Sequence, residues 1–423
     1  MIQMEKLKVR AHDLIKSGEK YLKTDTVYLA KGSFWNILSQ AASTIVSVGL
    51  AIAMGHLVPK ELYGNYKYLV SLASLIGAFS LTGLSTAVIQ AVAKGYDGEL
   101  REAFKLNLKW SFAIISISLI GALYYYFNKN LTLAGALVLI GALTPFLNGA
   151  LLYASFLAGK KEFKFLAVSG FWRNAVPAIV IIITILFTQN PLVLVAIYLT
   201  SNTIIAIFFY FYSLKKYERN NNIDPETGRY GIHLSAMTII GGIAEQIDKV
   251  VVFQHLGGAP LAVYSFATAI PLQLKGLFKN VYQLTLPKFA ERPLQEIRSQ
   301  MRQKMIVSGV ALILIVALYI SIAPFIFKLL FPKYMESIIY SQVFALSLLP
   351  YIMIFPQAAL HAHKAVARLY ETNIYLSVVK IVLILVPIFF YGIWGAIGGK
   401  IAYEFFAFLV VYRSFIKHAE IEA

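Results

Sequence analysis

Long apolar stretches separated by short polar ones run through the whole sequence. A helix that crosses a bilayer needs about 20 mostly apolar residues. By this criterion the sequence predicts about twelve transmembrane helices, at residues 33–56, 66–90, 109–127, 131–157, 165–188, 191–214, 232–255, 261–285, 305–330, 337–360, 371–391 and 393–416. Helix breakers such as Pro59, Pro191 and Gly392 separate them. The pattern therefore predicts an all-α integral membrane protein.

The most polar segment inside the chain, residues 217–231, lies halfway along it. Six predicted helices precede this segment and six follow, so both halves begin and end on the same side of the membrane. That arrangement indicates a parallel repeat of two pseudo-symmetric lobes, residues 32–216 and 232–423, joined by a cytoplasmic linker at 217–231. A short internal similarity supports duplication, because GHLVPKELYGNY (Gly55–Tyr66) ends the first predicted helix as QHLGGAPLAVY (Gln254–Tyr264) ends the seventh.

Composition agrees with a membrane protein. Of the 423 residues, 58% are hydrophobic and only 14% are charged, which lies outside the range of soluble domains. The absence of cysteine excludes disulfides and thiolate chemistry. The net charge of +17 would suit nucleic-acid binding, but the basic residues lie mostly in short loops between apolar stretches. That placement indicates membrane orientation, with no nucleic acid as a partner.

Most of the 38 Lys and Arg residues fall on one side if the N-terminus is placed in the cytoplasm. The other side holds Lys60, Lys67, Lys129, Lys328 and Lys333. Because basic loops stay in the cytoplasm, both termini are predicted to be cytoplasmic. Residues 1–31 carry apolar positions at helical spacing with basic residues on the other face. This pattern indicates an amphipathic helix on the cytoplasmic membrane surface; a basic tail that only sets orientation is the alternative.

Two stretches resemble a known family. HLVPKELYGNYKYLVSLASLIGAFSLTGLSTAVIQAVAKG, at residues 56–95, and EQIDKVVVFQHLGGAPLAVYSFATAI, at residues 245–270, lie at the start of the two lobes. They resemble bacterial polysaccharide flippases of the multidrug/oligosaccharidyl-lipid/polysaccharide (MOP) exporter superfamily. The second stretch has the family's acidic-basic pair, its Leu-Gly and its Tyr-x-x-Ala, here Asp248-Lys249, Leu256-Gly257 and Tyr264 to Ala267. The related lipid-linked peptidoglycan precursor flippases usually have fourteen helices, two more than this chain predicts.

The resemblance implies a V-shaped, MATE-like transporter in a bacterial or archaeal cytoplasmic membrane. It would move an undecaprenyl-diphosphate-linked oligosaccharide from the cytoplasmic to the outer leaflet of the phospholipid bilayer by alternating access. Such a flippase would serve polysaccharide, O-antigen or lipopolysaccharide biosynthesis beside polymerases and glycosyltransferases. The resemblance implies no cofactor other than a proton or sodium gradient.

Nine ionisable residues lie inside the predicted helices, although a charge at the bilayer centre costs about 2.5–3.5 kcal/mol on insertion scales. Six are basic: Arg173, Lys249, Lys275, Lys279, Lys380 and Lys400. Three are acidic: Glu245, Asp248 and Glu404. Such residues usually face a bundle interior or an aqueous cavity, and the excess of positive charge suits an anionic cargo. We therefore predict that the six basic residues bind the diphosphate, with Arg173 as a bidentate donor.

Other roles for these residues stay open. Glu245 with Lys249, and Lys400 with Glu404, are spaced i, i+4 and could neutralise each other. Lys279 and Arg173 lie nearer their helix ends and could extend to the interface. The three acids are candidates to carry a coupling proton or cation, because burial raises the pKa of a carboxyl group. For Asp248 the competing role is a fixed pair with Lys249.

A polar stripe runs along the first predicted helix at Asn36, Gln40, Ser43 and Ser47. It could contact sugar hydroxyls, or it could pack against a neighbouring helix, where small polar residues are common. The sequence shows no nucleophile–base constellation, so no catalytic residue is predicted. His361 and His363 have no third ligand nearby in the sequence, so no metal site is predicted.

Two other functions compete with a flippase. A membrane-embedded oligosaccharide ligase or polymerase would gather its catalytic groups on a large outer loop, whereas the longest predicted outer loop, residues 57–65, is short. A drug or cation exporter of the same superfamily would favour an acidic cavity, and this one is predicted to be basic. The sequence therefore predicts a transporter of an anionic glycolipid.

Overall fold

The computed structural model describes the backbone at residues 26–363 and 366–421, with the side chains of most of these residues. Within these ranges the chain forms helices and no strand. The predicted surface helix at residues 1–31 falls almost entirely outside the described residues.

The N-terminal half contains α3 (Thr26–Leu57), α4 (Lys60–Gly77), α5 (Leu84–Ala93), α6 (Glu99–Trp110), α7 (Phe112–Phe127), α8 (Leu131–Ala150), α9 (Leu152–Gly159), α10 (Phe163–Ile185) and α11 (Pro191–Tyr217). The C-terminal half contains α12 (Pro225–Leu256), α13 (Gly258–Ala290), α14 (Leu294–Leu330), η1 (Pro332–Tyr334), α15 (Ser337–Phe344), η2 (Ala345–Met353), α16 (Ile354–Ala362) and α17 (Val366–Ile421). The predicted linker at 217–231 is helical from Pro225 onward, so only residues 218–224 separate α11 from α12.

The helices account for twelve membrane crossings in the described ranges. Eight stretches are long and apolar enough to cross a membrane. One of them, Thr372–Glu420, turns back at Gly392 and so supplies two crossings. The other three crossings are α12, α13 and the pair α4–α5. Charged residues occur along α12 and α13, and near the start of α4. These three crossings are therefore the most polar ones. A cavity is expected beside them, because charged residues inside a crossing usually face one.

Glycine makes two of the turns possible. Gly257, between α12 and α13, has a φ of 95°, and Gly392, inside α17, has a φ of 56°. Side chains disfavour these values, whereas glycine adopts them readily. After Gly392 the chain packs closely on itself, because a Cβ at Gly399 would lie 2.2 Å from the backbone oxygen of Leu383. α17 is thus a tight hairpin of two crossings.

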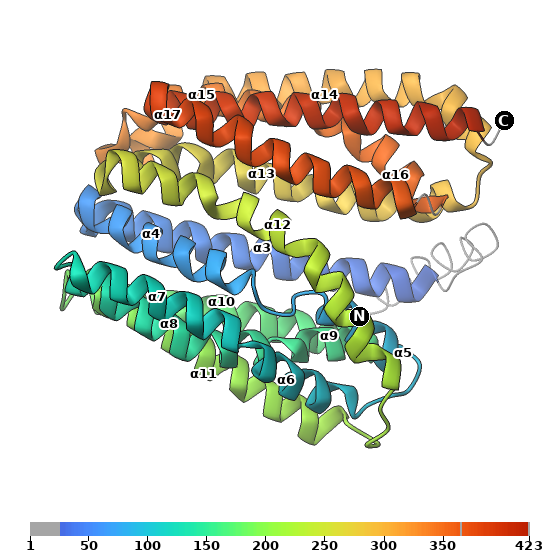
Figure 1. The fold of residues 1–423 in the computed structure, drawn as a ribbon. Helices are drawn as coiled ribbons and strands as arrows, with labels where there is room; N and C mark the ends of the chain where they lie inside the picture. Colours follow the sequence, from blue (N-terminus) through green and yellow to red (C-terminus); the bar gives the residue numbers. More distant parts are fainter. Residues whose placement is uncertain (1–25, 364–365, 422–423) are drawn as a thin grey trace, which may run out of the picture.

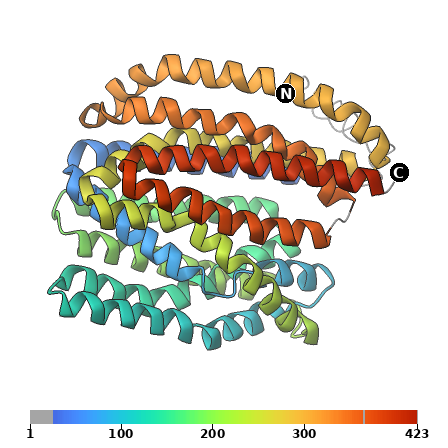
Figure 2. The same ribbon diagram turned by 45° about the horizontal axis from the view of Figure 1, so that its top comes forward.

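The two halves are connected at the centre by α12. Figure 1 shows the N-terminal half below and the C-terminal half above, diverging toward the end that carries α5 and α6, which the basic loops predict to be cytoplasmic. Figure 2 shows the same hairpin of α17 beside α12. α12 packs against α17 and α13 in its own half and against α4 and α5 of the other half. A Cβ at Gly242 would lie 2.7 Å from the Ala78 Cβ, so small residues allow this crossing.

The end predicted to face outward is closed by contacts between the halves. The Glu61 carboxylate of α4 accepts hydrogen bonds from the backbone amides of Gly258 and Ala259, at 3.2 and 2.9 Å. Tyr68 of α4 stacks on Phe253 of α12, with ring centroids 3.8 Å apart. These contacts join the first turn of α13 and the last turns of α12 to α4.

The segment that connects the halves is fixed to the N-terminal half. The buried Asp97 carboxylate accepts a hydrogen bond from the Arg219 amide at 2.8 Å and forms an ion pair with Lys160 at 2.5 Å. The backbone amide of Gly98 donates a hydrogen bond to the backbone carbonyl oxygen of Asn222 at 3.0 Å. The connecting segment, residues 218–224, is therefore held against the N-terminal half.

Candidate functional site

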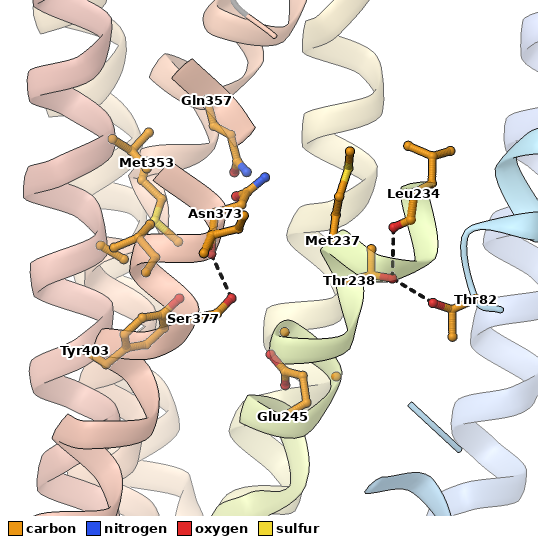
Figure 3. A pocket seen from close by; sticks show the side chains of 16 residues that line it. Thr82, Leu234, Met237, Thr238, Glu245, Met353, Gln357, Asn373, Ser377 and Tyr403 are labelled. Atoms are coloured by element: carbon orange, nitrogen blue, oxygen red, sulfur yellow. Dashed lines mark hydrogen bonds between the residues drawn. The ribbon is translucent and has the colours of Figure 1, made fainter. Parts of the chain in front are cut away.

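A cavity of about 660 Å³ lies between α12 and the C-terminal helices η2, α16 and α17, with Thr82 of the N-terminal half on its rim. We call it the C-side cavity. Figure 3 shows its polar side chains: Gln357 and Asn373 face α12, and the Thr82 hydroxyl bonds that of Thr238 at 2.7 Å. Glu245 lies deeper, on α12. This cavity is polar enough on one wall to hold water or sugar hydroxyls.

A second cavity of about 340 Å³ lies on the other face of α12, against α4, α8 and α11. We call it the N-side cavity. Its polar lining includes Ser74, Asn148 and Gln246. Thr82 and Glu245 line both cavities, so the two spaces adjoin across α12. Together they form a central region with walls from both halves.

The second predicted helix is interrupted where it meets this region. Residues 78–83 separate α4 from α5, whereas the sequence predicts one continuous helix at 66–90. The break brings Thr82 to both cavities and Gly83 against α12, where the Gly83 amide donates to the Ser235 hydroxyl at 2.9 Å. The sequence contains a local signal of this break at Ser80, Thr82 and Gly83. The high mean hydropathy of the whole stretch obscures it.

Three lysines of the C-terminal half form ion pairs with the three acids. Lys400 of α17 binds the fully buried Asp248 of α12 at 2.5 Å. The Tyr264 hydroxyl donates to the same carboxylate at 2.5 Å. Because both charges are withdrawn from water, each depends on the other for its stability.

The other two pairs also join different crossings. Lys380 binds Glu245 between α17 and α12, and Lys275 binds Glu404 between α13 and α17. We call these three pairs the paired cluster. Neither of the i, i+4 pairs that the sequence left open, nor a pair of Asp248 with Lys249, is a salt bridge among the described residues. Each acid instead takes its partner from another crossing.

Lys249 of α12 takes part in none of the three pairs of the paired cluster. Its Nζ donates to the Gln246 side-chain oxygen at 2.9 Å, and Gln246 lines the N-side cavity. Within the described residues Lys249 forms no salt bridge. Its amine contacts the wall of this cavity through Gln246, and the charges of Asp248 and Glu245 act on it without a salt bridge.

Lys67 is a residue that the sequence assigned to the outer side and that the structure places inside the protein. It lies in the second turn of α4, half-buried, with its Nζ 5.4 Å from the centroid of the Tyr63 ring. The described residues offer it no carboxylate partner within salt-bridge distance. The signal in the sequence was its position inside the apolar run that follows Tyr66.

Arg173 lies apart from the paired cluster. It belongs to α10, and its charge acts on Tyr153 and Tyr198 of the N-terminal half. Tyr198 lines the N-side cavity, so Arg173 lies behind one wall of it. The Lys279 side chain lies outside the described residues.

The polar stripe on α3 divides into two kinds of residue. Ser43 accepts a hydrogen bond from the Asn174 amide of α10 at 2.9 Å, which is a helix-packing contact. Gln40 and Ser47 line a mostly apolar cavity beside α13 and α14. The Asn36 side chain lies outside the described residues. The described part of the stripe is separate from the two central cavities.

Of the nine ionisable residues, Glu245 alone lines the central cavities within the described part of the chain. Lys380 and Lys249 contact side chains of that lining, Glu245 and Gln246. The other two ion pairs lie further into the C-terminal half: Lys275 with Glu404, and Lys400 with Asp248. The structure thus gathers most of the predicted residues around α12 without bringing all of them to one surface.

The chain matches one protein-family model. Residues 29–291 match the model of a family described as polysaccharide biosynthesis protein. No curated protein matches the chain.

Several solved structures resemble it over most of its length. A multidrug resistance MATE family transporter of the MOP superfamily, in an inward-facing conformation, shares 14% identity with a TM-score of 0.67, over 90% of this chain and 95% of that one. The lipid II flippase MurJ, in an inward closed conformation, shares 14% identity with a TM-score of 0.69, over 90% and 87%. A MOP superfamily transporter from Pyrococcus furiosus, described as having a binding pocket of reverse polarity, shares 12% identity with a TM-score of 0.57, over 93% and 96%. These likenesses show the fold to be that of MOP transporters.

Proposed function

Because the chain belongs to the family of polysaccharide biosynthesis proteins, we propose that it is a flippase for a lipid-linked oligosaccharide. Its cargo would be a glycan on undecaprenyl diphosphate, moved from the cytoplasmic to the outer leaflet of a bacterial or archaeal cytoplasmic membrane. O-antigen and other cell-surface polysaccharides are glycans of this class. Polymerases and glycosyltransferases of the same biosynthesis would act before and after it.

The observation that carries the proposal is the pair of cavities that adjoin across α12, with walls from both halves. A transporter that works by alternating access needs its binding site at the interface between its repeats. The C-side cavity extends along the part of α12 and α17 that the loops predict to be cytoplasmic, from Leu234 to Glu245 and from Tyr403 to Val411. The opposite end is closed by Glu61 and Tyr68. This arrangement suits a site open to the cytoplasmic leaflet.

The composition of the cavity walls favours a sugar cargo over an apolar drug. Thr82, Asn148, Gln357 and Asn373 present hydroxyl and amide groups to the cavities, and such groups hydrogen-bond to sugar hydroxyls. The basic residues just behind the walls, Lys249 among them, favour an anionic group over a cationic one.

The family and the structural neighbours also favour transport over catalysis. The family match and the likeness to MATE and MurJ structures support transport, whereas a ligase or polymerase would require a group that attacks the glycolipid. No role for either kind of enzyme is proposed.

The test is translocation by the purified protein in proteoliposomes. A fluorescent undecaprenyl-diphosphate oligosaccharide is placed in one leaflet, and its appearance in the other is measured by quenching. We expect protein-dependent translocation, and comparison of imposed proton and sodium gradients identifies the coupling ion. Translocation of a cationic dye in place of the glycolipid would instead establish a drug exporter and overturn the proposal.

A further inference from the structure

The charge that reaches the central cavities differs in sign from the excess charge of the predicted helices. Six basic and three acidic residues lie inside those helices. Among the described residues, Glu245 is the one charged side chain that lines the C-side cavity or the N-side cavity, and it lines both. The surface that a cargo meets between the halves therefore carries a carboxylate and not an ammonium group.

The ion pair of Glu245 with Lys380 exposes its acid and covers its lysine. The Glu245 side chain is 69% exposed, whereas that of Lys380 is 11% exposed. Lys380 lies over the Tyr403 ring, with its Nζ 5.4 Å from the ring centroid, and binds Oε1 of the carboxylate. The other oxygen, Oε2, has no hydrogen bond to a described residue. The carboxylate thus keeps a free acceptor while Lys380 supplies the counterion that a charge inside a protein needs.

The opposite walls of the C-side cavity add neutral polar groups. Gln357 of α16 and Asn373 of α17 face α12 (Figure 3). Their side-chain amides form no hydrogen bond with the described part of the chain, whereas Thr82 and Thr238 bond each other. An amide both donates and accepts, and an ionised carboxylate only accepts. Hydroxyl groups satisfy both kinds of partner, so this set of free groups suits a ligand rich in neutral hydroxyls.

A sugar that carries a carboxylate of its own fits this surface poorly. The exposed Glu245 carboxylate repels it, and the covered Lys380 is already bound. A cationic ligand gains little, because Lys380 neutralises the charge of Glu245. A volume of about 660 Å³ lies within the range of roughly 300–1,000 Å³ for pockets that enclose small ligands. The cavity therefore has room for sugar rings and a reason to discriminate among them.

We propose that Glu245 is a specificity-determining residue of the C-side cavity. Its free carboxylate oxygen accepts hydrogen bonds from sugar hydroxyls, and its charge selects glycans of uncharged sugars over glycans that contain uronic acids. Gln357 and Asn373 complete the contacts from the opposite walls. Selectivity then comes in part from an unfavourable contact with the wrong cargo. This inference rests on the proposed function, because it assumes that the glycan enters this cavity.

A competition between two glycolipids tests the inference. Proteoliposomes of the full chain receive two undecaprenyl-diphosphate oligosaccharides of equal length, one of neutral hexoses and one with a hexuronic acid in place of one hexose. The measured quantity is the ratio of their initial translocation rates. We expect the neutral glycolipid to be translocated about tenfold faster or more, because like charges repel in a site partly withdrawn from water.

Variants of Glu245 decide whether this residue causes the preference. Glu245→Gln keeps an acceptor oxygen, removes the charge and leaves Lys380 without its acid, so the ratio should fall to near unity or invert. Glu245→Asp keeps the charge and should keep the preference. The inference is overturned if the native protein prefers the acidic glycolipid, or if Glu245→Gln retains the native ratio. Thermal unfolding of each variant establishes that it is folded.

Glu336→Gln is the matched control. Glu336 is also an exposed, ion-paired acid, bound to Lys60 with its side chain 53% exposed, but it lines neither central cavity. The ratio of the two rates should stay at the native value in this variant, even if both rates change. A ratio that falls equally in Glu336→Gln and Glu245→Gln would overturn the inference, since the loss of any acid would then suffice.

Binding of soluble sugars separates this inference from the proposed function. The neutral and the acidic oligosaccharide, freed from lipid, are compared for binding to the detergent-purified chain by saturation-transfer NMR. If neither glycolipid is translocated but the neutral sugar binds preferentially and Glu245→Gln abolishes that preference, the specificity stands and the flippase function falls. If both glycolipids are translocated at equal rates by the native protein and by Glu245→Gln, the function stands and the specificity falls.

Discussion

Asp248 and Lys249 are neighbours in α12, yet they belong to two regions that handle charge differently. Asp248 is fully buried and bound to Lys400, and the Tyr264 hydroxyl donates to the same carboxylate oxygen. Lys249 donates a hydrogen bond to a neutral amide oxygen, that of Gln246. The paired cluster therefore holds helices together, whereas Lys249 forms no salt bridge within the described residues. Adjacent positions on a helix point about 100° apart, so a single helix can serve both regions.

The largest effect should come from breaking a pair in the paired cluster. Lys400→Ala leaves the Asp248 carboxylate buried without a counterion, which costs about 3–5 kcal/mol. We expect a strong fall in the thermal unfolding temperature and in the yield of monodisperse protein. The double variant Asp248→Asn with Lys400→Met removes both charges and should recover most of the loss. Equal destabilisation by the single and double variants would show that the pair is not what stabilises this region.

A smaller effect is expected at the edge of the same cluster. Glu245 pairs with Lys380, but its side chain is 69% exposed to the cavities. Exposed ion pairs contribute at most about 1 kcal/mol, so Glu245→Gln should lower the unfolding free energy by no more than that. Thermal unfolding beside Glu404→Gln, whose carboxylate is only 10% exposed, measures the difference. If Glu245→Gln proved the more destabilising of the two, exposure would not be the deciding factor.

The smallest effect on stability should come from Lys67, which forms no salt bridge within the described residues. Lys67→Met removes a half-buried charge that has no acid partner among the described residues, so nothing is left uncompensated. We expect the unfolding free energy to change by less than about 1 kcal/mol, toward greater stability. Thermal unfolding of the variant beside the native protein measures the change. A large destabilisation by Lys67→Met would instead give Lys67 a structural role.

The sequence predicted the membrane crossings well because twenty-residue apolar stretches are a local property. The helix break at residues 78–83 could not be predicted in this way, because hydropathy averages over Ser80 and Thr82. The chain packs closely on itself at Gly399, where a Cβ would lie 2.2 Å from the backbone oxygen of Leu383. Its neighbour Gly398 has no atom within 4 Å of a Cβ built on it. Which face of a helix meets another depends on the tertiary fold and not on residue type.

The candidate site was predicted in part for the same reason. Deep lysines and acids are visible in the sequence, but their partners are not. Helical spacing suggested Glu245 with Lys249, and the structure pairs Glu245 with Lys380, far along the chain. Lys67 was assigned to the outer side because it lies near a helix end, and the structure places its amine against the Tyr63 ring, half-buried. The binding roles of Arg173, Lys249, Lys275, Lys279, Lys380 and Lys400, and the coupling roles of the acids, stay predictions.

The way residues 218–224 are fastened has a consequence for movement. Asp97 and Gly98 hold this segment against the N-terminal half through Arg219 and Asn222. If the halves rock as the proposed function requires, this short segment has no free length to extend. The connecting chain would then have to bend within α12 rather than in the segment that joins the two repeats.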